Sequence, residues 1–148
     1  MKNKNILLTG FLIITLLNGC GYKPVYSSKD FLFKISEIKH DNKKINKRIA
    51  RSLKSISNEN ATKSLTVELN SKKEKNIISK NKNGDPEIFE LKIMINIIVK
   101  DKQKKFLGKQ VYNNTENKFE FNEYEIQIEN QIITKMIDEI IIFLSERR

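Results

Sequence analysis

The sequence predicts an α+β fold, a two-layer sandwich in which a four-stranded mixed sheet carries two helices on one face. Apolar residues alternate with polar ones in four segments and recur at the helical period in two others, in the order strand, helix, three strands, helix. Each helical segment has one apolar stripe, so both helices should cover the same sheet face and leave the other to water or a partner. The 148 residues suffice for one such domain, which we place at residues 31–148.

A short strand and an amphipathic helix open the predicted domain. Phe31, Phe33 and Ile35 share one face of a strand at 31–35, and residues 40–42 form a turn that can cap a helix. The helix begins at Lys43 and ends near residue 57. Its apolar stripe consists of Ile45, Ile49, Leu53 and Ile56, and its opposite side, which we expect to face solvent, carries Lys43, Lys44, Lys47, Arg48, Arg51 and Lys54.

Three strands make up the middle of the domain. The second strand begins near Leu65 and can continue past a lysine-rich break through Ile78. Isoleucine is most frequent in the third strand, which should therefore be the most buried. The segments after Ile78 are a turn at 81–86, the third strand at 88–99, a turn at 101–105 and the fourth strand at 106–117.

A long C-terminal helix, from about residue 122 to residue 147, should be the main cover of the sheet. Burying about seven of its apolar side chains contributes on the order of 10 to 20 kcal/mol before chain entropy is subtracted. The predicted stripe consists of Ile126, Ile133, Met136, Ile137, Ile140 and Leu144, and it is widened by Ile132 and Phe143.

The order of these elements also predicts the sheet topology. A helix between the first two strands favours a parallel pair joined by a right-handed crossover. The short turns between the last three strands favour an antiparallel meander.

The N-terminus has the features of a bacterial lipoprotein signal. Two lysines precede an apolar stretch at 6–17, which is shorter than the roughly 20 residues that span a bilayer. The stretch leads into a segment that resembles a lipobox, consisting of Leu17, Asn18, Gly19 and Cys20. The sequence therefore predicts a signal peptide at 1–19, lipidation of Cys20 and an extended leader at 20–30.

Lipidation would place the protein on a membrane surface. Cys20 is the only cysteine, and lipidation would convert its thiol into a thioether with diacylglycerol and acylate its amine. Each buried methylene of an acyl chain contributes about 0.8 kcal/mol, so several chains anchor the protein stably. Gly21 stands where an Asp would favour inner-membrane retention in the best-known sorting systems. Resemblance to those systems implies the periplasmic face of the outer membrane.

The net charge of +10 at first suggests a nucleic-acid partner. However, 24 of the 28 basic residues are lysines, and isoleucine and asparagine are also frequent, as in proteins from AT-rich genomes. Proteins that read nucleic acids favour arginine for its bidentate fork and aromatic residues for stacking, and neither is enriched here. We therefore expect no nucleic-acid partner.

The sequence also argues against an enzyme. His40 is the only histidine, and lipidation would consume Cys20, so no Cys/His dyad or Cys/His metal site can form. The carboxylates lie among lysines without the spacing of a catalytic pair, and a glycine-rich phosphate loop is missing from the sequence. We therefore expect no catalytic residues, metal or cofactor.

The start of the mature chain resembles that of the LptE family, the lipopolysaccharide-assembly lipoproteins of Gram-negative bacteria, in their alphaproteobacterial form. The resemblance lies in Cys20-Gly21-Tyr22-Lys23-Pro24-Val25-Tyr26, followed by the same element order and length. It implies an outer-membrane lipoprotein that plugs the LptD β-barrel, supports its assembly and contacts lipopolysaccharide. The alternative is another periplasm-facing interaction module, such as a pilotin or a barrel-assembly accessory with an unrelated partner.

Two lysine clusters near the predicted turns are candidate contacts for the phosphates of lipopolysaccharide. Lys can pair with phosphate as a point charge. Ordinary solvated hairpins in a lysine-rich chain would give the same pattern. The candidate residues are Lys102, Lys104 and Lys105 at one turn, and Lys80 and Lys82, in a cluster with Lys72, Lys73 and Lys75, at the other.

Overall fold

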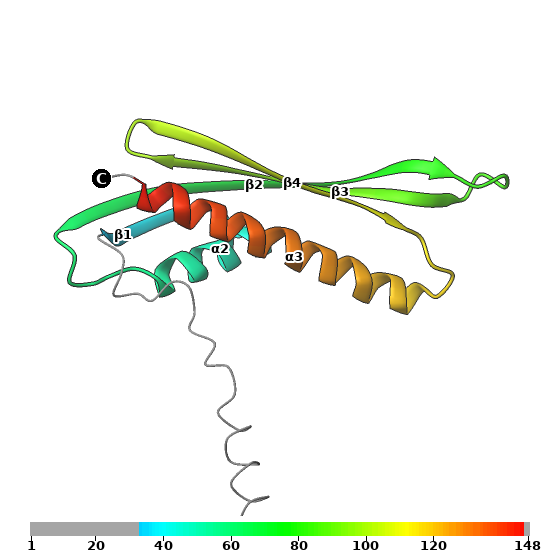
Figure 1. Ribbon diagram of the computed structural model, residues 1–148, viewed down its shortest axis with the longest axis horizontal. Coiled ribbons are helices and arrows are strands. Elements are labelled where there is room, and N and C mark those ends of the chain that lie inside the picture. The colour runs from blue at the N-terminus through cyan, green and yellow to red at the C-terminus, as the bar shows by residue number, and fades with distance from the viewer. Residues whose placement is uncertain (1–32, 147–148) are drawn as a thin grey trace, which may run out of the picture.

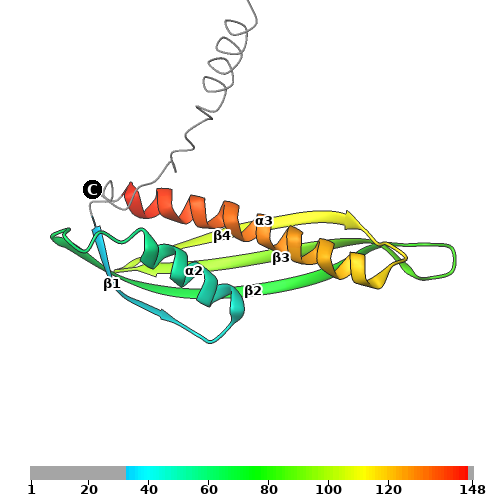
Figure 2. The ribbon, with the colours of Figure 1, turned by 90° about the horizontal axis from the view of Figure 1, so that it is seen from below.

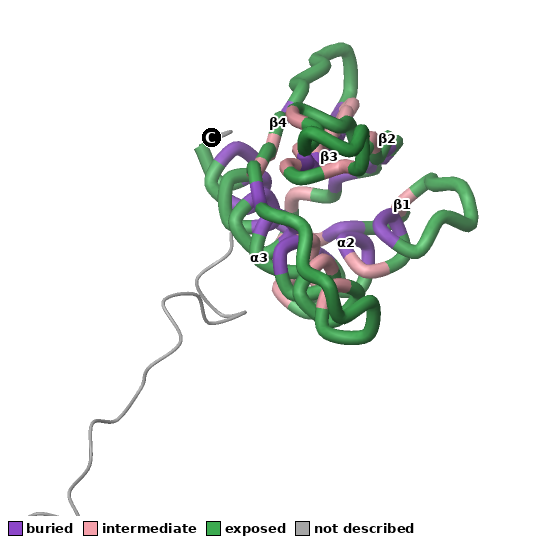
Figure 3. The backbone as a smooth tube through the Cα atoms, turned by 90° about the vertical axis from the view of Figure 1, so that its right-hand side faces the viewer, coloured by how far each residue is buried: buried purple, intermediate pink, exposed green. Residues whose placement is uncertain are grey.

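A four-stranded sheet forms one layer of the molecule and two helices form the other (Figure 1). This computed structural model describes residues 33–146. Its elements are β1 (Phe33–His40), α2 (Lys44–Ser55), β2 (Lys63–Lys80), β3 (Pro86–Val99), β4 (Lys102–Asn113) and α3 (Lys118–Ser145). The end-on view in Figure 3 shows both helices on the same side of the sheet, which confirms the predicted α+β sandwich.

The sheet has the predicted topology. Its strand order is β1-β2-β3-β4, with β1 parallel to β2 and the other neighbours antiparallel. β1 pairs only with the first part of β2, up to Leu69 opposite His40. β1 ends there, and Figure 2 shows the chain turning from the end of β1 toward α2, so that the second half of β2 is a sheet edge.

The core lies between the helices and one face of the sheet. Every second residue of β3 points into it, and Ile93, Ile95 and Ile97 are 0% exposed, which confirms the third strand as the most buried. α2 packs on β1 and β2, while α3 lies along β4 and β3. The core therefore extends along the length of the sheet instead of forming a sphere.

The predicted stripe of α3 is buried except at Ile126, and Ile141, which was not assigned to the stripe, is buried as well. The side chain of Ile126 is 48% exposed, whereas Ile128, which was also not assigned to the stripe, is 1% exposed. Ile126 lies at the edge of the stripe, in the wall of a groove that separates α3 from the start of α2. The α2 side chains at the groove leave Ile126 half exposed. The residues of this part of α3 that are buried are Ile128 and Ile132.

Two predicted turns have different bounds because the strands beside them are longer than expected. His40 ends β1 instead of starting a turn. β2 continues past the lysine-rich break to Lys80, which confirms that the second strand extends through Ile78. Instead of the turn expected at 101–105, β3 and β4 are joined by only two residues, Lys100 and Asp101, of which Lys100 has a φ of 55°. Strand pairing therefore resumes at once at Lys102, opposite Val99.

The helix boundaries also differ from the predicted ones. α2 ends at Ser55, earlier than predicted, while α3 begins at Lys118 instead of near residue 122. The side chain of Asn117 caps α3 by accepting hydrogen bonds from the backbone N–H groups of Phe119 and Glu120. β4 accordingly ends at Asn113, because residues up to 117 form the connection.

Candidate functional site

The lipidation motif falls outside the part of the chain that the structure describes. Leu17, Asn18, Gly19 and Cys20 precede residue 33, as does the leader that follows them. Their roles therefore remain predictions from the sequence. Within residues 33–146 no helix combines the length and the apolar character needed to cross a bilayer. The same residues contain no group of three or more His, Asp and Glu side chains placed to hold a metal ion.

The five candidate lysines do not form a single site. Lys80 and Lys82 lie at the β2–β3 turn, and Lys102 begins β4 at the opposite end of the sheet (Figure 1). β3 connects the two turns with 14 residues, which at about 3.3 Å per residue separates them by roughly 45 Å. The two groups would have to contact different ligands or different parts of a large one.

Strand pairing also divides the group at 102–105. Lys104 pairs with Ile97, a core residue, and therefore lies on the helix-covered face, as does Lys102. Lys105 pairs with Asn96 and lies on the open face. The three lysines thus belong to a strand and not to a loop, and alternation along the strand sends them in two directions.

Lys104 is engaged within the fold. Its ammonium lies 4.7 Å from the ring centre of Phe143 on α3 and 5.2 Å from that of Phe106. Both distances are within the range of cation–π attraction. Lys104 therefore helps to dock the end of α3 on the sheet.

The open face of the sheet carries an apolar centre surrounded by lysines. Met94 and Leu107 are cross-strand neighbours there, and Leu107 is 57% exposed. They line a depression of about 510 Å³ together with lysines from three strands. We call this surface the open-face patch, and it consists of Lys72, Lys92, Met94, Lys105 and Leu107.

Acidic neighbours balance only part of the charge in the open-face patch. The ammonium of Lys72 lies 2.6 Å from Glu74, and that of Lys92 lies 3.9 Å from the same carboxylate. The hydrogen bond from Lys72 lowers the pKa of Glu74 below its ordinary value. Within residues 33–146, Lys105 has no ion-pair partner. The patch combines net positive charge with exposed apolar surface, which suits an anionic amphiphile or an acidic protein surface.

Lys75 contacts other residues of the fold and is not a candidate ligand contact. Its ammonium lies 2.7 Å from Glu125 and within 4.3 and 4.6 Å of the ring centres of Phe89 and Phe121. The Tyr112 hydroxyl donates a hydrogen bond to the same carboxylate. These contacts join β2, β3 and β4 to the first half of α3, so Lys75 is not available to an anion.

Opposing effects set the pKa values in this cluster. Burial raises the pKa of Glu125, but the hydrogen bonds from Lys75 and Tyr112 outweigh it, so the net pKa lies below the ordinary value. Burial, followed by the adjacent carboxylate, raises the pKa of Tyr112 above its ordinary value. Tyr112 therefore remains a protonated donor and Glu125 a charged acceptor at neutral pH.

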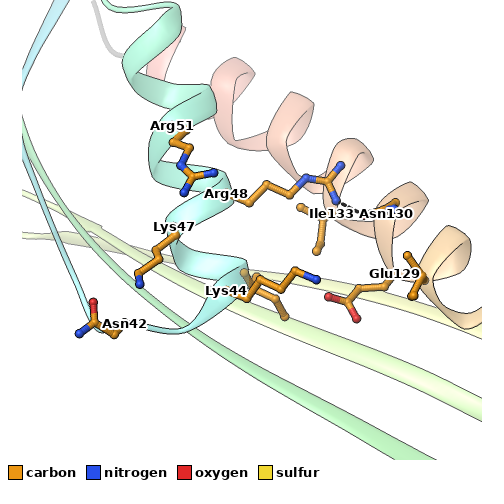
Figure 4. Close-up of a pocket in the computed structure, with 10 residues that line it drawn as sticks. Asn42, Lys44, Lys47, Arg48, Arg51, Glu129, Asn130 and Ile133 are labelled. Carbon is orange, nitrogen blue, oxygen red and sulfur yellow. Dashed lines mark hydrogen bonds between the residues drawn. The ribbon is translucent and has the colours of Figure 1, made fainter. Parts of the chain in front are cut away.

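A groove between α2 and α3 is a feature that the sequence analysis missed (Figure 4). Its volume is about 360 Å³. Arg48 reaches across it, donating hydrogen bonds to Asn130 and, at 3.2 Å, to Thr134 of α3. The groove is lined by Asn42, Lys44, Ile45, Lys47, Arg48, Arg51, Ile126, Glu129, Asn130 and Ile133.

The sequence did contain a signal for this groove. Lys44, Lys47, Arg48 and Arg51 follow the spacing i, i+3, i+4, i+7, which places them on one side of a helix. This side was predicted to face solvent. The packing of α3 beside α2 turns it into the wall of a groove, and a sequence pattern within one helix does not reveal which helix lies next to it.

The fold is shared with solved bacterial lipoproteins of low sequence identity. Rare lipoprotein B from Shewanella oneidensis has a TM-score of 0.59 and 12% identity, covering 75% of this chain and 95% of that one. An uncharacterized lipoprotein B from Nitrosomonas europaea has a TM-score of 0.63 and 13% identity, with coverages of 85% and 91%. A minor lipoprotein from Acinetobacter baumannii has a TM-score of 0.58 and 10% identity, covering 78% of this chain and 94% of that one. No protein-family model and no curated protein matches the sequence.

Proposed function

We propose that this protein is an outer-membrane lipoprotein of the LptE type, which occupies the lumen of an LptD-like β-barrel, supports its assembly and contacts lipopolysaccharide. The proposal is supported by the combination of a sequence that resembles a lipobox ending at Cys20 with the fold of solved bacterial lipoproteins. The proposal assigns the protein a structural and binding role without catalysis.

The dimensions of the chain are compatible with this role. The 12 residues between Cys20 and Phe33 can extend by at most about 43 Å, so a lipid at Cys20 would keep the domain close to the membrane. The surface of the domain is rich in lysine and asparagine, which suits the water-filled interior of a large barrel. Neither helix covers the open face of the sheet, because both lie on the other side (Figure 3).

The open-face patch is the surface that we assign to the partner. Its apolar centre, Met94 and Leu107, would be buried by contact with the barrel wall or with acyl chains. Lys105 and Lys72 would lie beside acidic groups of the barrel or phosphates of lipopolysaccharide. Lys80 and Lys82, at the other end of the sheet, would form a separate contact.

Site-specific crosslinking in cells tests the barrel partnership. A photo-crosslinking amino acid at Leu107 should capture an outer-membrane β-barrel protein, recovered at equal stoichiometry after detergent extraction. The control position is Ile142, an exposed apolar residue of α3 in the opposite layer. Capture of a different partner at Leu107 would favour the pilotin or accessory alternative. A lack of barrel capture at both positions would refute the partnership.

A pair of lysine variants tests the contact with lipopolysaccharide. Lys105→Gln should weaken binding to lipopolysaccharide more than Lys102→Gln, because only Lys105 lies on the open face. The two variants remove the same charge from the same strand. If neutralising Lys102, Lys104 and Lys105 together leaves the affinity unchanged, this end of the sheet does not contact lipopolysaccharide.

A further inference from the structure

The groove between α2 and α3 has an arrangement of charges that α2 does not need for its own stability. The α2 sequence contains four lysines and arginines in the groove wall and no acidic residue. Lys44 and Arg48 are four residues apart, as are Lys47 and Arg51, and like charges at this spacing destabilise a helix. Lys44 also lies in the first turn, where the helix dipole disfavours a cation.

Neighbouring elements do little to neutralise these cations. Within residues 33–146, no acidic side chain forms an ion pair with Lys44, Lys47 or Arg51. Among the residues that the structure describes, Glu129 is the only carboxylate that lines the groove, and it is bound to Lys73 of β2 at 2.5 Å. A local arrangement that lowers stability without compensation is typical of a functional site.

The groove also has the shape and lining of a small-ligand site. Figure 4 shows Arg48 extending from α2 toward Asn130 and Ile133 of α3, and Lys44 extending toward Glu129. Arg48 is already oriented by Asn130 and Thr134, and these two bonds leave other N–H donors of its guanidinium for a ligand. Ile126, half exposed, adds apolar surface beside the cations.

We propose that this groove binds a phosphate ester, with Lys44 and Arg48 as its principal charge partners, Lys47 and Arg51 adding positive potential at the rim, and Ile126 and Ile133 contacting the ester's carbon atoms. A volume of about 360 Å³ lies within the usual range of ligand pockets, roughly 300 to 1,000 Å³. Arg supplies a planar fork for phosphate oxygens and Lys supplies a point charge. The proposal concerns the helix layer alone and does not depend on the barrel partner or on the open-face patch.

The binding test uses the full chain in a nonionic detergent, titrated with sn-glycerol 3-phosphate in phosphate-free buffer. Isoleucine methyl resonances in NMR spectra report the site. The methyl groups of Ile126 and Ile133 should shift, whereas that of Ile78, an exposed isoleucine at the far end of β2, should not. Shifts of Ile78 alone, or no saturable shift, would overturn the proposal.

Two variants locate the charge partners. Lys44→Gln should raise the dissociation constant about tenfold, because it removes one charge-assisted contact. Lys54→Gln removes the same charge from the last turn of the same helix, outside the groove, and should change the constant by less than about twofold. Equal effects of the two variants would overturn the proposal.

Thermal unfolding separates loss of binding from loss of folding. Without ligand, Lys44→Gln should melt at or above the temperature of the wild type, because the removed cation is unfavourable to α2. Ile126→Glu places a carboxylate in the groove wall at a half-exposed position and should abolish binding in a folded protein. Full binding by folded Ile126→Glu would contradict the assignment.

Further titrations identify the source of the phosphate ester. Neutral phosphatidylcholine vesicles are compared with vesicles that also contain phosphatidylglycerol. Groove-dependent binding to the anionic vesicles, competed by glycerol phosphate, identifies a lipid headgroup, whereas binding of glycerol phosphate alone identifies a free ester. If hexaglutamate shifts the Ile126 and Ile133 methyls and glycerol phosphate does not, the groove binds an acidic polypeptide and the proposal fails.

Discussion

The ammonium of Lys75 on β2 lies 2.7 Å from the carboxylate of Glu125 on α3. The two residues are 50 positions apart in the sequence, and their contact is surrounded by the rings of Phe89, Tyr112 and Phe121. α3 extends beyond α2 in this half of the molecule (Figure 2). The Lys75–Glu125 pair and its aromatic surroundings therefore attach the first half of α3 to the sheet without help from the other helix.

Removing the cation of this pair should destabilise the protein. Lys75→Met leaves the half-buried carboxylate of Glu125 without its charge partner, and we expect a loss of about 1–3 kcal/mol in the free energy of unfolding, measured with urea. Lys72→Met is the matched control, because Lys72 forms an exposed ion pair and should cost less than about 1 kcal/mol. An equal loss for both variants would show that the surroundings of Lys75 add nothing.

The same pair should make stability depend on acid. The pKa of Glu125 is lower in the folded protein than its ordinary value of 4.5. Its contribution is therefore fully present above this value and is lost as the pH falls through the lower folded pKa. Between about pH 6 and about pH 3, the wild type should lose more free energy of unfolding than Glu125→Gln. Parallel pH profiles would contradict the assigned shift.

Gly108 of β4 lies at a close approach between the sheet and α3. A Cβ atom at this position would collide with Cγ2 of Ile132 and lie 3.0 Å from the sulfur of Met136. Because Ile132 is β-branched and stiff in a helix, Gly108→Ala should cost about 1–3 kcal/mol in the free energy of unfolding. Ile132→Leu removes Cγ2 and should recover part of the loss in the double variant. Additive losses would indicate that the helix moves instead of the side chain.

Adjacent lysines of β4 should respond differently to the same substitution. Lys104→Gln removes a cation from the rings of Phe106 and Phe143 and should lower the free energy of unfolding by about 0.5–1 kcal/mol. Lys105→Gln, on the open face, should have an effect within about 0.5 kcal/mol. A larger loss of stability for Lys105→Gln than for Lys104→Gln would mean that the pairing of β4 with β3 is shifted by one residue.

Lipidation can be tested without reference to the fold. Cys20→Ser should prevent incorporation of labelled palmitate and release the protein from the membrane fraction, because no thiol remains to accept the lipid. Asn18→Ala, a change within the predicted lipobox that leaves the cysteine intact, is the control and should keep the label. Labelled Cys20→Ser protein would refute the lipobox.

The element types and their order could be predicted from the sequence because they depend on local periodicity. Alternation at period two and at the helical period places Ile93, Ile95 and Ile97 in the core strand and Ile133, Met136 and Ile140 under α3. The topology followed from the lengths of the connections. Boundaries were less accurate, since Lys102–Lys105 reads as a polar turn until pairing with the buried end of β3 makes it a strand.

The sequence by itself determined the α+β order and the apolar stripes, and it is the source of the predicted lipobox at Cys20. Only the tertiary structure decided which charged residues act together: Lys75 with Glu125, Lys105 with the open-face patch, and Arg48 with Asn130 and Thr134 across the groove. The physical reason is the distance in sequence between the residues that interact. Apolar periodicity is encoded within a few residues, whereas strand register and helix packing bring together side chains up to 86 positions apart, as for Arg48 and Thr134.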